Sequence, residues 1–493
     1  MLNPALFSDA NLPAVPVYVV DEGAWLKLKM SFSPLAQAIA SHHRFEAKEG
    51  SVLLITGATG ALDQVIVGAG KSLAQCDPFV LSKLNDSLPD GDYALDTASL
   101  YRDGSSDTAV DLTLLTLGFL MGRYRFERYK TATLSKVRLR IPCGVSNNVA
   151  DEVDAHDVSR IMAGVTLGRD LINTPAHDCS PQTLEDTSIS LAQRFNASIN
   201  VMRADALLSQ NFPMIHAVGR ASNGDLKREP RLIDLKWQPQ THGDAQVATL
   251  PSITLVGKGV CFDTGGLNIK SDSGMLLMKK DMGGAACVLA IASMVMDAQL
   301  PLRLRVLIPA VENSIAGNAF RPGDVLQSRK GLSVEIGNTD AEGRLILADA
   351  LTYADEEQPD LIIDVATLTG AARVALGPDL PPLMCNDDTL AGALMSSAEN
   401  THDPIWRLPL WNPYESMLNS KIADTNNISS TSYAGTILAG LFLRKFISIE
   451  RQWAHFDIFG WTPTAKLGKP EGGEVNAARL IYHYLKTFSQ KRT

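Results

Sequence analysis

Residues 360–366 read DLIIDVA, a run that is apolar apart from its two aspartates. A half-buried strand alternates apolar and polar residues, whereas a strand covered on both faces is apolar nearly throughout. The segment therefore predicts a central strand of a parallel sheet. Outward from it, strands are expected at 252–256, 302–308 and 333–336, and helices at 283–296 and 345–354. This alternation predicts an α/β domain with a mixed, mostly parallel sheet between helical layers.

The first 150 residues predict a smaller α/β domain of their own. We expect strands at 51–56 and 137–141, and an amphipathic helix over 111–130 with a charged, aromatic end. A polar segment then places a boundary near Ala150. A helix over about 156–172, ended by Pro175, follows it. The predicted organisation is an N-terminal domain (1–150), a connecting helix (151–174) and a larger C-terminal domain (175–493).

Composition narrows the class of protein. The net charge of −9 does not suit a phosphate backbone or an anionic membrane. The N-terminus lacks a basic segment followed by an apolar one, and the longest nearly uncharged stretch, 283–296, is too short to span a membrane. The six cysteines are scattered without a Cys-x-x-Cys pair, which favours a reducing compartment. We therefore expect a cytoplasmic protein that does not bind membranes or, as its main role, nucleic acid.

Residues 65–72, VIVGAGKS, end like a phosphate-binding loop. Such a loop needs a glycine where this sequence has Val65, because the turn must aim several backbone N–H groups at phosphate. We therefore interpret the segment as a strand that ends in a glycine turn.

Three other segments place charged residues among glycines and apolar residues. They are 256–270 (VGKGVCFDTGGLNIK) with Lys258, Asp263 and Lys270, 278–286 (MKKDMGGAA) with Asp281, and 338–344 (NTDAEGR) with Asp340, Glu342 and Arg344. We expect all of them at strand ends of one sheet, where ligands of such folds bind. Four carboxylates brought together would repel, and divalent metal is the simplest remedy. Oxygen-rich ligand sets suit Zn, Mn or Mg, and bridging carboxylates favour two ions.

Each residue also has an ordinary structural interpretation. Lys258 and Lys270 could be solvated, and Asp281 could cap a helix. Asp340 could be a turn residue, and Arg344 could pair with a neighbouring carboxylate at the surface. From the residues alone, these roles and a metal site are about equally favoured. The sequence contains neither His-Glu-x-x-His nor Gly-x-Ser-x-Gly, which argues against zincins and serine hydrolases.

The run NTDAEGRLILADAL (338–351) resembles the signature of the leucyl, or cytosol, aminopeptidase family of dinuclear metallopeptidases. Three further segments resemble other conserved blocks of this family, namely GKGVCFDTGGLNIK (257–270), KDMGGAA (280–286) and DVATLTGA (364–371). The likeness runs in order from about Asp170 to the end and is weaker before it, as in 122–130. It implies a metal-dependent aminopeptidase, a hydrolase of N-terminal peptide bonds, whose catalytic domain is 175–493.

The resemblance also implies ligands for two divalent ions, Mn or Zn. Asp263 and Glu342 would bridge the ions. Lys258 and Asp281 would complete the tighter site, and Asp340 the more exchangeable one. Lys258 would then coordinate as a neutral amine, so that metal has to displace its proton.

The catalytic roles implied by the resemblance fall to Lys270 and Arg344. Lys270 would stabilise the oxyanion formed from the scissile carbonyl, and Arg344 would hold a bicarbonate ion that acts as general base toward the bridging water. The substrate site would be lined by Lys270, Met278, Thr367 and Leu368. The free α-amine of a peptide would bind a metal, and the family implies a homohexamer whose active sites face an enclosed cavity.

One segment departs from the family pattern. Residues 454–464, AHFDIFGWTPT, carry Phe459 and Trp461 where several relatives have smaller residues, so the pocket for the N-terminal side chain would be shallower and a leucine preference is in doubt. Two rival functions remain. A phosphoesterase is disfavoured because no phosphate-binding glycine loop or Arg cluster accompanies the carboxylates, and DNA binding is disfavoured by the net charge.

Overall fold

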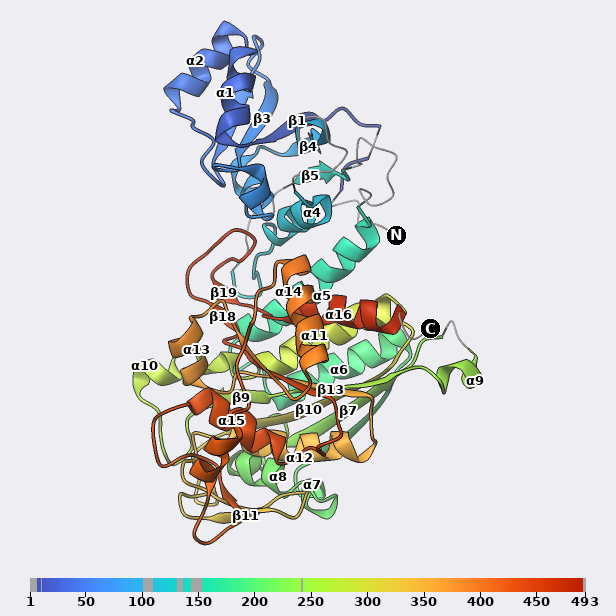
Figure 1. Cartoon of the computed structure of the whole chain (residues 1–493), viewed down its shortest axis with the longest axis vertical. Coiled ribbons are helices and arrows are strands. Elements are labelled where there is room, and N and C mark those ends of the chain that lie inside the picture. The colour runs from blue at the N-terminus through green and yellow to red at the C-terminus, as the bar shows by residue number, and fades with distance from the viewer. Residues whose placement is uncertain are drawn as a thin grey trace. The chain divides into compact units, whose positions relative to one another are not determined.

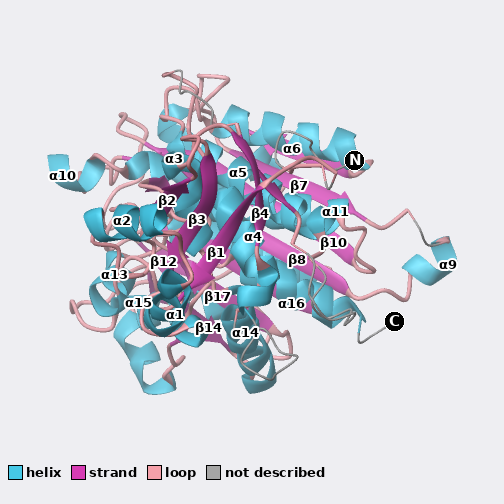
Figure 2. Cartoon of the chain, turned by 90° about the horizontal axis from the view of Figure 1, so that it is seen from above, coloured by secondary structure: helices cyan, strands magenta, loops and turns pink. Residues whose placement is uncertain are grey.

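The strand β13, Leu361–Ala366, is buried along its whole length, as its sequence predicts. It lies inside a nine-stranded sheet of order β15-β14-β17-β13-β8-β10-β7-β6, to which β9 is added beside β10. In the view of Figure 2, β7, β10, β8, β17 and β14 follow one another across this sheet. The strands are β6 Ser198–Arg203, β7 Arg231–Trp237, β8 Ser252–Gly257, β9 Gly259–Asp263, β10 Arg303–Asn313, β14 Pro382–Cys385, β15 Trp406–Arg407 and β17 Trp453–Asp457.

The sheet is mixed and mostly parallel, as predicted. Strands β17, β13, β8 and β10 are parallel neighbours, and β9 also runs parallel to β10. Antiparallel pairing is found between β14 and β17 on one side and among β10, β7 and β6 on the other. The predicted strand at 302–308 continues to Asn313, because residues 309–313 pair in turn with β7 and β9. This extension places Asn313 beside Asp263.

Helices cover both faces of the sheet (Figure 1). One layer contains α6 Pro181–Phe195, α11 Gly283–Asp297, α14 Asp388–Thr401 and α16 Ala478–Gln490. The other contains α8 Pro213–Gly219, α12 Gly343–Glu356 and α15 Gly435–Arg444. Helix α11 is buried from Gly283 to Met296. A helix that is apolar all round belongs inside a domain, so α11 forms part of the core.

A separate small sheet contradicts one expectation. The strand predicted at 333–336 is β12, Ser333–Glu335, and it lies in a three-stranded sheet between β11, Val325–Gln327, and β16, Thr425–Asn426. It was wrong to place it in the large sheet. Its residues alternate in burial instead of forming an apolar run, and its parallel partner β16 comes from about 90 residues further along the chain. The remaining strands, β18 Trp461–Thr462 and β19 Gly472–Gly473, pair with each other.

The smaller unit has a five-stranded sheet of order β2-β3-β1-β4-β5. Its elements are β1 Val15–Val20, α1 Glu22–Met30, α2 Pro34–His42, β2 Val52–Thr56, β3 Leu62–Gly68, α3 Leu84–Ser87, β4 Gly91–Leu95, α4 Leu112–Met121 and β5 Val137–Arg140. The strands predicted at 51–56 and 137–141 are confirmed as β2 and β5. Residues 65–72 form the end of β3 and a turn in which Gly70 has φ +74°, as interpreted from the sequence.

The predicted helix over 111–130 is too long and is not amphipathic. Helix α4 ends at Met121, and eight of its ten residues are buried. Gly122 follows it and packs directly on the backbone of Ser82, where a Cβ atom would lie 2.2 Å from the carbonyl oxygen. The charged segment 123–130 lies beyond this contact and is not helical.

The structure, a computed structural model, describes residues 7–9, 11–100, 110–130, 136–142, 153–240 and 243–490. It divides into two compact units, Met1–Met162 with Thr464–Glu471, and Ala163–Pro463 with Gly472–Thr493. The division falls within α5, Ala155–Asn173, which closely matches the helix predicted at 156–172. The boundary predicted near Ala150 lies outside the described residues. No helix in the described part of the chain has the length and apolar character needed to cross a membrane.

Candidate active site

The carboxyl ends of parallel strands supply the first part of the site. Lys258 lies between β8 and β9, Asp263 ends β9, and Thr367 and Leu368 follow β13. Because these strands are parallel neighbours or pair with the same strand, their ends meet at one edge of the large sheet.

Two helix starts supply the rest. Asp281 lies between a short 3₁₀ turn, Met278–Lys280, and α11, whereas Asp340, Glu342 and Arg344 lie where β12 leads into α12. The expectation that all these segments follow strands of one sheet is therefore wrong. The helix-capping interpretation of Asp281 is also wrong, because Met282 is the N-cap residue of α11 and no side chain caps that helix.

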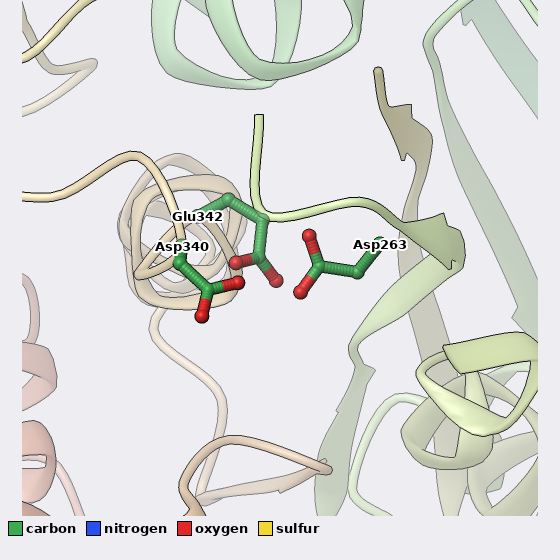
Figure 3. Close-up of side chains that lie close together, drawn as sticks. All are labelled: Asp263, Asp340 and Glu342. Carbon is green, nitrogen blue, oxygen red and sulfur yellow. The ribbon is translucent and has the colours of Figure 1, made fainter. Parts of the chain in front are cut away.

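Three carboxylates converge. Asp263, Asp340 and Glu342 each offer an oxygen, and the three atoms lie within 4.8 Å of one another. Figure 3 shows the carboxyl groups of these residues turned toward each other, with Asp263 coming from β9 and Glu342 from the start of α12. Asp263 is 2% exposed and Glu342 1%, so water screens their mutual repulsion poorly.

Lys258 joins the fourth carboxylate to this group. Its Nζ lies 2.8 Å from Asp281 Oδ2 and 3.0 Å from Glu342 Oε1, and it donates a 2.9 Å hydrogen bond to the carbonyl oxygen of Thr367. Burial alone would lower the pKa of Lys258, but the charges of the surrounding carboxylates outweigh burial and raise it. Lys258 is thus a buried ammonium held by acids, and it was wrong to consider it a solvated residue.

Lys270 lies on the other side of Asp263. Its Nζ is 2.8 Å from Asp263 Oδ2 and also pairs with Asp340. Burial would lower the pKa of Lys270, but Asp263 and the other acids raise it. Lys270 is partly accessible, in contrast to Lys258, and it therefore remains a charged donor at the edge of the cluster.

Two of the carboxyl groups have raised pKa values, which means that their surroundings favour binding of a proton or another cation. Burial and the charge of Asp263 raise the pKa of Glu342 to about 8 and that of Asp340 to about 6. The oxygens Asp281 Oδ2, Asp340 Oδ1 and Glu342 Oε1 are buried, and their partners among the described residues are the ammonium groups of Lys258 and Lys270. Buried carboxylate oxygens that are balanced only by cationic groups also fit divalent cations, which prefer oxygen ligands and displace protons on binding.

Glycine allows Lys258 to reach the cluster. A Cβ atom at Gly343 would lie 2.5 Å from Lys258 Cε, so only glycine lets α12 begin against this lysine. At Gly284, a Cβ atom would lie 2.0 Å from the carbonyl oxygen of Val365. The start of α11 therefore packs on the backbone of β13 at Val365, whose carbonyl oxygen also accepts a hydrogen bond from Lys258 N at 3.1 Å.

Asn313 and Thr339 link the two loops that carry Asp263 and Asp340. Asn313 Nδ2 donates to Asp263 Oδ1 at 2.8 Å and to the Thr339 carbonyl oxygen at 3.1 Å. The Thr339 hydroxyl donates to the Gly265 carbonyl oxygen at 2.6 Å. These bonds fix the end of β9 against the segment from the small sheet.

Asn427 is the main support of the loop 337–341. It is fully buried; its Oδ1 accepts from Gly337 N at 2.8 Å, and its Nδ2 donates to the Asn338 carbonyl oxygen at 2.8 Å. Its carbonyl oxygen accepts from Arg344 Nη1 at 2.6 Å. The amino-acid sequence gives no signal for this role, because Asn427 lies in the mostly polar segment NNISS and looks like a surface residue.

Arg344 is buried at the start of α12, so the interpretation of a surface pair is wrong. Burial lowers its pKa to about 10. Its Nη1 donates to Asn427, as described above. Its Nε is enclosed and has no hydrogen-bond partner among the described residues. A guanidinium with a spare donor in a low-dielectric place suits a small anion.

The remaining predicted residues border the cluster. The Thr367 hydroxyl donates to Asp281 Oδ1 at 2.8 Å. Leu368 N donates to Asp457 Oδ1 at 2.9 Å, and Asp457, at the end of β17, thereby fixes the loop after β13. Met278 is half-buried in the 3₁₀ turn before Asp281. The structure thus brings every predicted site residue into one region, while Asn313, Asn427 and Asp457 were missed.

A buried group of acids with two lysines at the carboxyl edge of an α/β sheet is typical of a hydrolase that uses divalent metal. Comparisons with known proteins identify the family to which this chain belongs. The model of the cytosol aminopeptidase family catalytic domain matches residues 166–482, and that of the M17 aminopeptidase N-terminal domain matches residues 15–142. The chain therefore belongs to the cytosol aminopeptidase family, which supports a peptidase with metal-dependent aminopeptidase activity.

Individual relatives agree over nearly the whole chain. A probable cytosol aminopeptidase of Roseiflexus castenholzii is 36% identical, with 90% of this chain and 91% of that protein covered. Among solved structures, the cytosol aminopeptidase of Coxiella burnetii is 41% identical with a TM-score of 0.88, covering 99% of this chain and 100% of that one. The bottromycin maturation enzyme BotP in complex with Mn is 30% identical with a TM-score of 0.83, covering 97% and 100%.

The contacts of Asn427 predict a selective effect on metal binding. Asn427→Ala should weaken Mn²⁺ binding about 10–100-fold, since groups that orient metal ligands typically contribute that much. The measurement is a Mn²⁺ titration of the metal-free protein, followed by calorimetry. Asn386→Ala is the control, because that side chain also bonds two backbone groups, of Arg451 and Trp453, but away from the cluster. Equal Mn²⁺ affinities of the two variants would contradict this role.

Proposed function

We propose that this protein removes the N-terminal residue from peptides that have a free N-terminus, with two divalent ions, Lys270 and Arg344 as its chemical groups. The observation that carries the proposal is the convergence of Asp263, Asp340 and Glu342, joined by Asp281 through Lys258. Such a cluster of buried acids is tolerable when cations lie among them.

Asp263 and Glu342 are the bridging ligands in this proposal. Lys258 and Asp281 complete one ion site, and Asp340 the other. The bound ions supply Lewis-acid chemistry, which polarises the peptide carbonyl and makes water more acidic. Mn is supported by the complex of the related BotP, and Zn is the alternative. Lys258 has to lose its proton to serve as a ligand, and the carbonyl oxygen of Thr367 then holds the neutral amine by a hydrogen bond.

Lys270 stabilises the oxyanion. Its ammonium group is partly accessible and keeps its proton because Asp263 and Asp340 surround it. When cations also bind Asp263 and Asp340, these acids no longer occupy all the N–H groups of the lysine. The lysine can then direct an N–H toward the carbonyl oxygen of the scissile bond. A positioned donor gives its greatest benefit where charge develops in the transition state.

Arg344 holds a bicarbonate ion that acts as general base. Its enclosed Nε lacks a partner among the described residues, while Asn427 fixes the guanidinium through Nη1. A base supplied in this way accounts for the absence of a His among the residues that form the cluster.

Substrate binding falls to Met278, Thr367 and Leu368 together with Lys270. Thr367 is fixed by its bond to Asp281 and Leu368 by Asp457, so both are rigid parts of the site. The free α-amine would reach the ions and thereby limit cleavage to the first peptide bond. By family membership we further propose a homohexamer with enclosed sites and a cytoplasmic location.

Glu342→Ala tests the proposed function. Loss of a bridging carboxylate should abolish Mn²⁺-dependent hydrolysis of aminoacyl anilides, while circular dichroism and the melting temperature show a folded protein. Glu356→Ala on the same helix is the control and should keep activity, because Glu356 is exposed and pairs only with Arg329 among the described residues. Full activity of Glu342→Ala, or wild-type turnover of a phosphate ester in place of the anilide, would contradict the proposal.

Lys270→Ala tests the oxyanion role. Removing one oxyanion donor typically costs about 2.7–4 kcal/mol, so kcat should fall about 10²–10³-fold with little change in KM. Steady-state kinetics at saturating Mn²⁺ measure both constants, and metal analysis checks that the ions are retained. If only KM changes, Lys270 binds substrate without stabilising the transition state.

A further inference from the structure

Lys280, the residue before Asp281, is buried without an acceptor for its ammonium group. It is 6% exposed, yet within the described ranges its Nζ makes no hydrogen bond or ion pair. Lys258 and Lys270, by contrast, each contact two carboxylates. The Nζ of Lys280 is also not among the fully enclosed polar atoms, so an outside molecule can reach it. An acidic group that reached this Nζ would supply the acceptor that the described residues do not.

The ammonium group of Lys280 lies over the aromatic ring of Phe459. Lys280 Nζ lies 4.9 Å from the centre of the Phe459 ring, and Arg373 Cζ lies 4.5 Å from the same ring. Arg373 comes from α13, Gly370–Leu376; it is exposed, and it too has no ion pair within the described part of the chain. We call Lys280, Phe459 and Arg373 the basic wall.

The basic wall adjoins the catalytic cluster. Gly460, next to Phe459, packs against Thr367, and a Cβ atom there would lie 3.1 Å from Thr367 Cγ2 and 3.8 Å from the Lys280 carbonyl oxygen. Thr367 in turn bonds Asp281. The wall therefore stands beside the place where the side chain of an N-terminal residue would lie if its α-amine were at the metal ligands.

We propose that the basic wall selects peptides whose N-terminal residue is glutamate or aspartate; this inference rests on the proposed aminopeptidase function. An acidic side chain supplies the acceptor that Lys280 lacks, in a charge-assisted hydrogen bond. A leucine side chain would meet the bulky Phe459 ring and cover the ammonium group without pairing it. Discrimination by an unpaired polar group of this kind is strong, since the wrong substrate leaves the buried charge unsatisfied.

The experiment compares kcat/KM for glutamyl, glutaminyl and leucyl anilides with the Mn²⁺-loaded enzyme. Wild-type protein should cleave the glutamyl substrate at least about tenfold better than either of the others. Lys280→Met, which keeps the length and apolar body of the side chain, should reverse the preference toward leucine. Lys279→Met is the matched control and should keep the wild-type ratio, because Lys279 already donates to the Asn173 carbonyl oxygen at 2.7 Å.

The outcomes separate the two proposals. If no aminoacyl anilide is cleaved, the proposed function itself fails. If wild-type enzyme cleaves the leucyl or glutaminyl substrate as well as the glutamyl one, the selectivity proposal is overturned although the function stands. The same holds if Lys280→Met retains the glutamyl preference. The wild-type comparison alone decides the matter if Lys280→Met does not fold.

Discussion

The repulsion among four carboxyl groups in a nearly water-free place is the constraint on which the site depends. Asp263 and Glu342 are buried together with Asp281, and Asp340 lies at their edge. Lys258 and Lys270 partly neutralise them, and burial together with the charge of Asp263 raises the pKa of Glu342 and of Asp340. Divalent ions neutralise the same charges more completely, so that assembly of the site and binding of metal are physically coupled.

Contacts between loops, more than the pairing of strands, hold these acids close together. Asp263 ends β9 of the large sheet, whereas Asp340 lies in the loop that follows β12 of the small sheet. Hydrogen bonds between the two segments are needed to fix their relative positions. Asn313, Thr339 and Asn427 supply these links by hydrogen bonds to backbone groups of both loops. A rigid frame of this kind fixes the distances between the carboxylates, which would lower the cost of ordering them around an ion.

Much of this arrangement was predictable from the sequence, for physical reasons. Continuous apolar runs such as 361–366 and 283–296 mark elements that are buried on all sides, and both were found as β13 and α11. Clustered glycines beside acids marked the places where backbones pass close to one another, as Gly343 does against Lys258. The family resemblance, confirmed by the comparisons, supplied the candidate site residues in addition.

What could not be predicted depends on long-range contacts. The partner of β12 is β16, far along the chain, so its place in a separate sheet has no local signal. The same is true of Asn427, whose polar neighbours suggest exposure, and of Gly122, where packing on Ser82 ends α4 early. Lys280 stands beside a second lysine, and only the structure distinguishes the one that lacks an acceptor from the one that has it.

The number of bound ions shows whether the four acids form a site for two divalent cations. Metal-free protein is dialysed to equilibrium against excess Mn²⁺, and metal and protein are then quantified, for the wild type and for Asp263→Asn. We expect two Mn²⁺ ions per wild-type chain and a loss of one or both in the variant, since Asp263 would touch both ions. Absence of bound Mn²⁺ in the wild type, or an undiminished count in Asp263→Asn, would contradict this expectation.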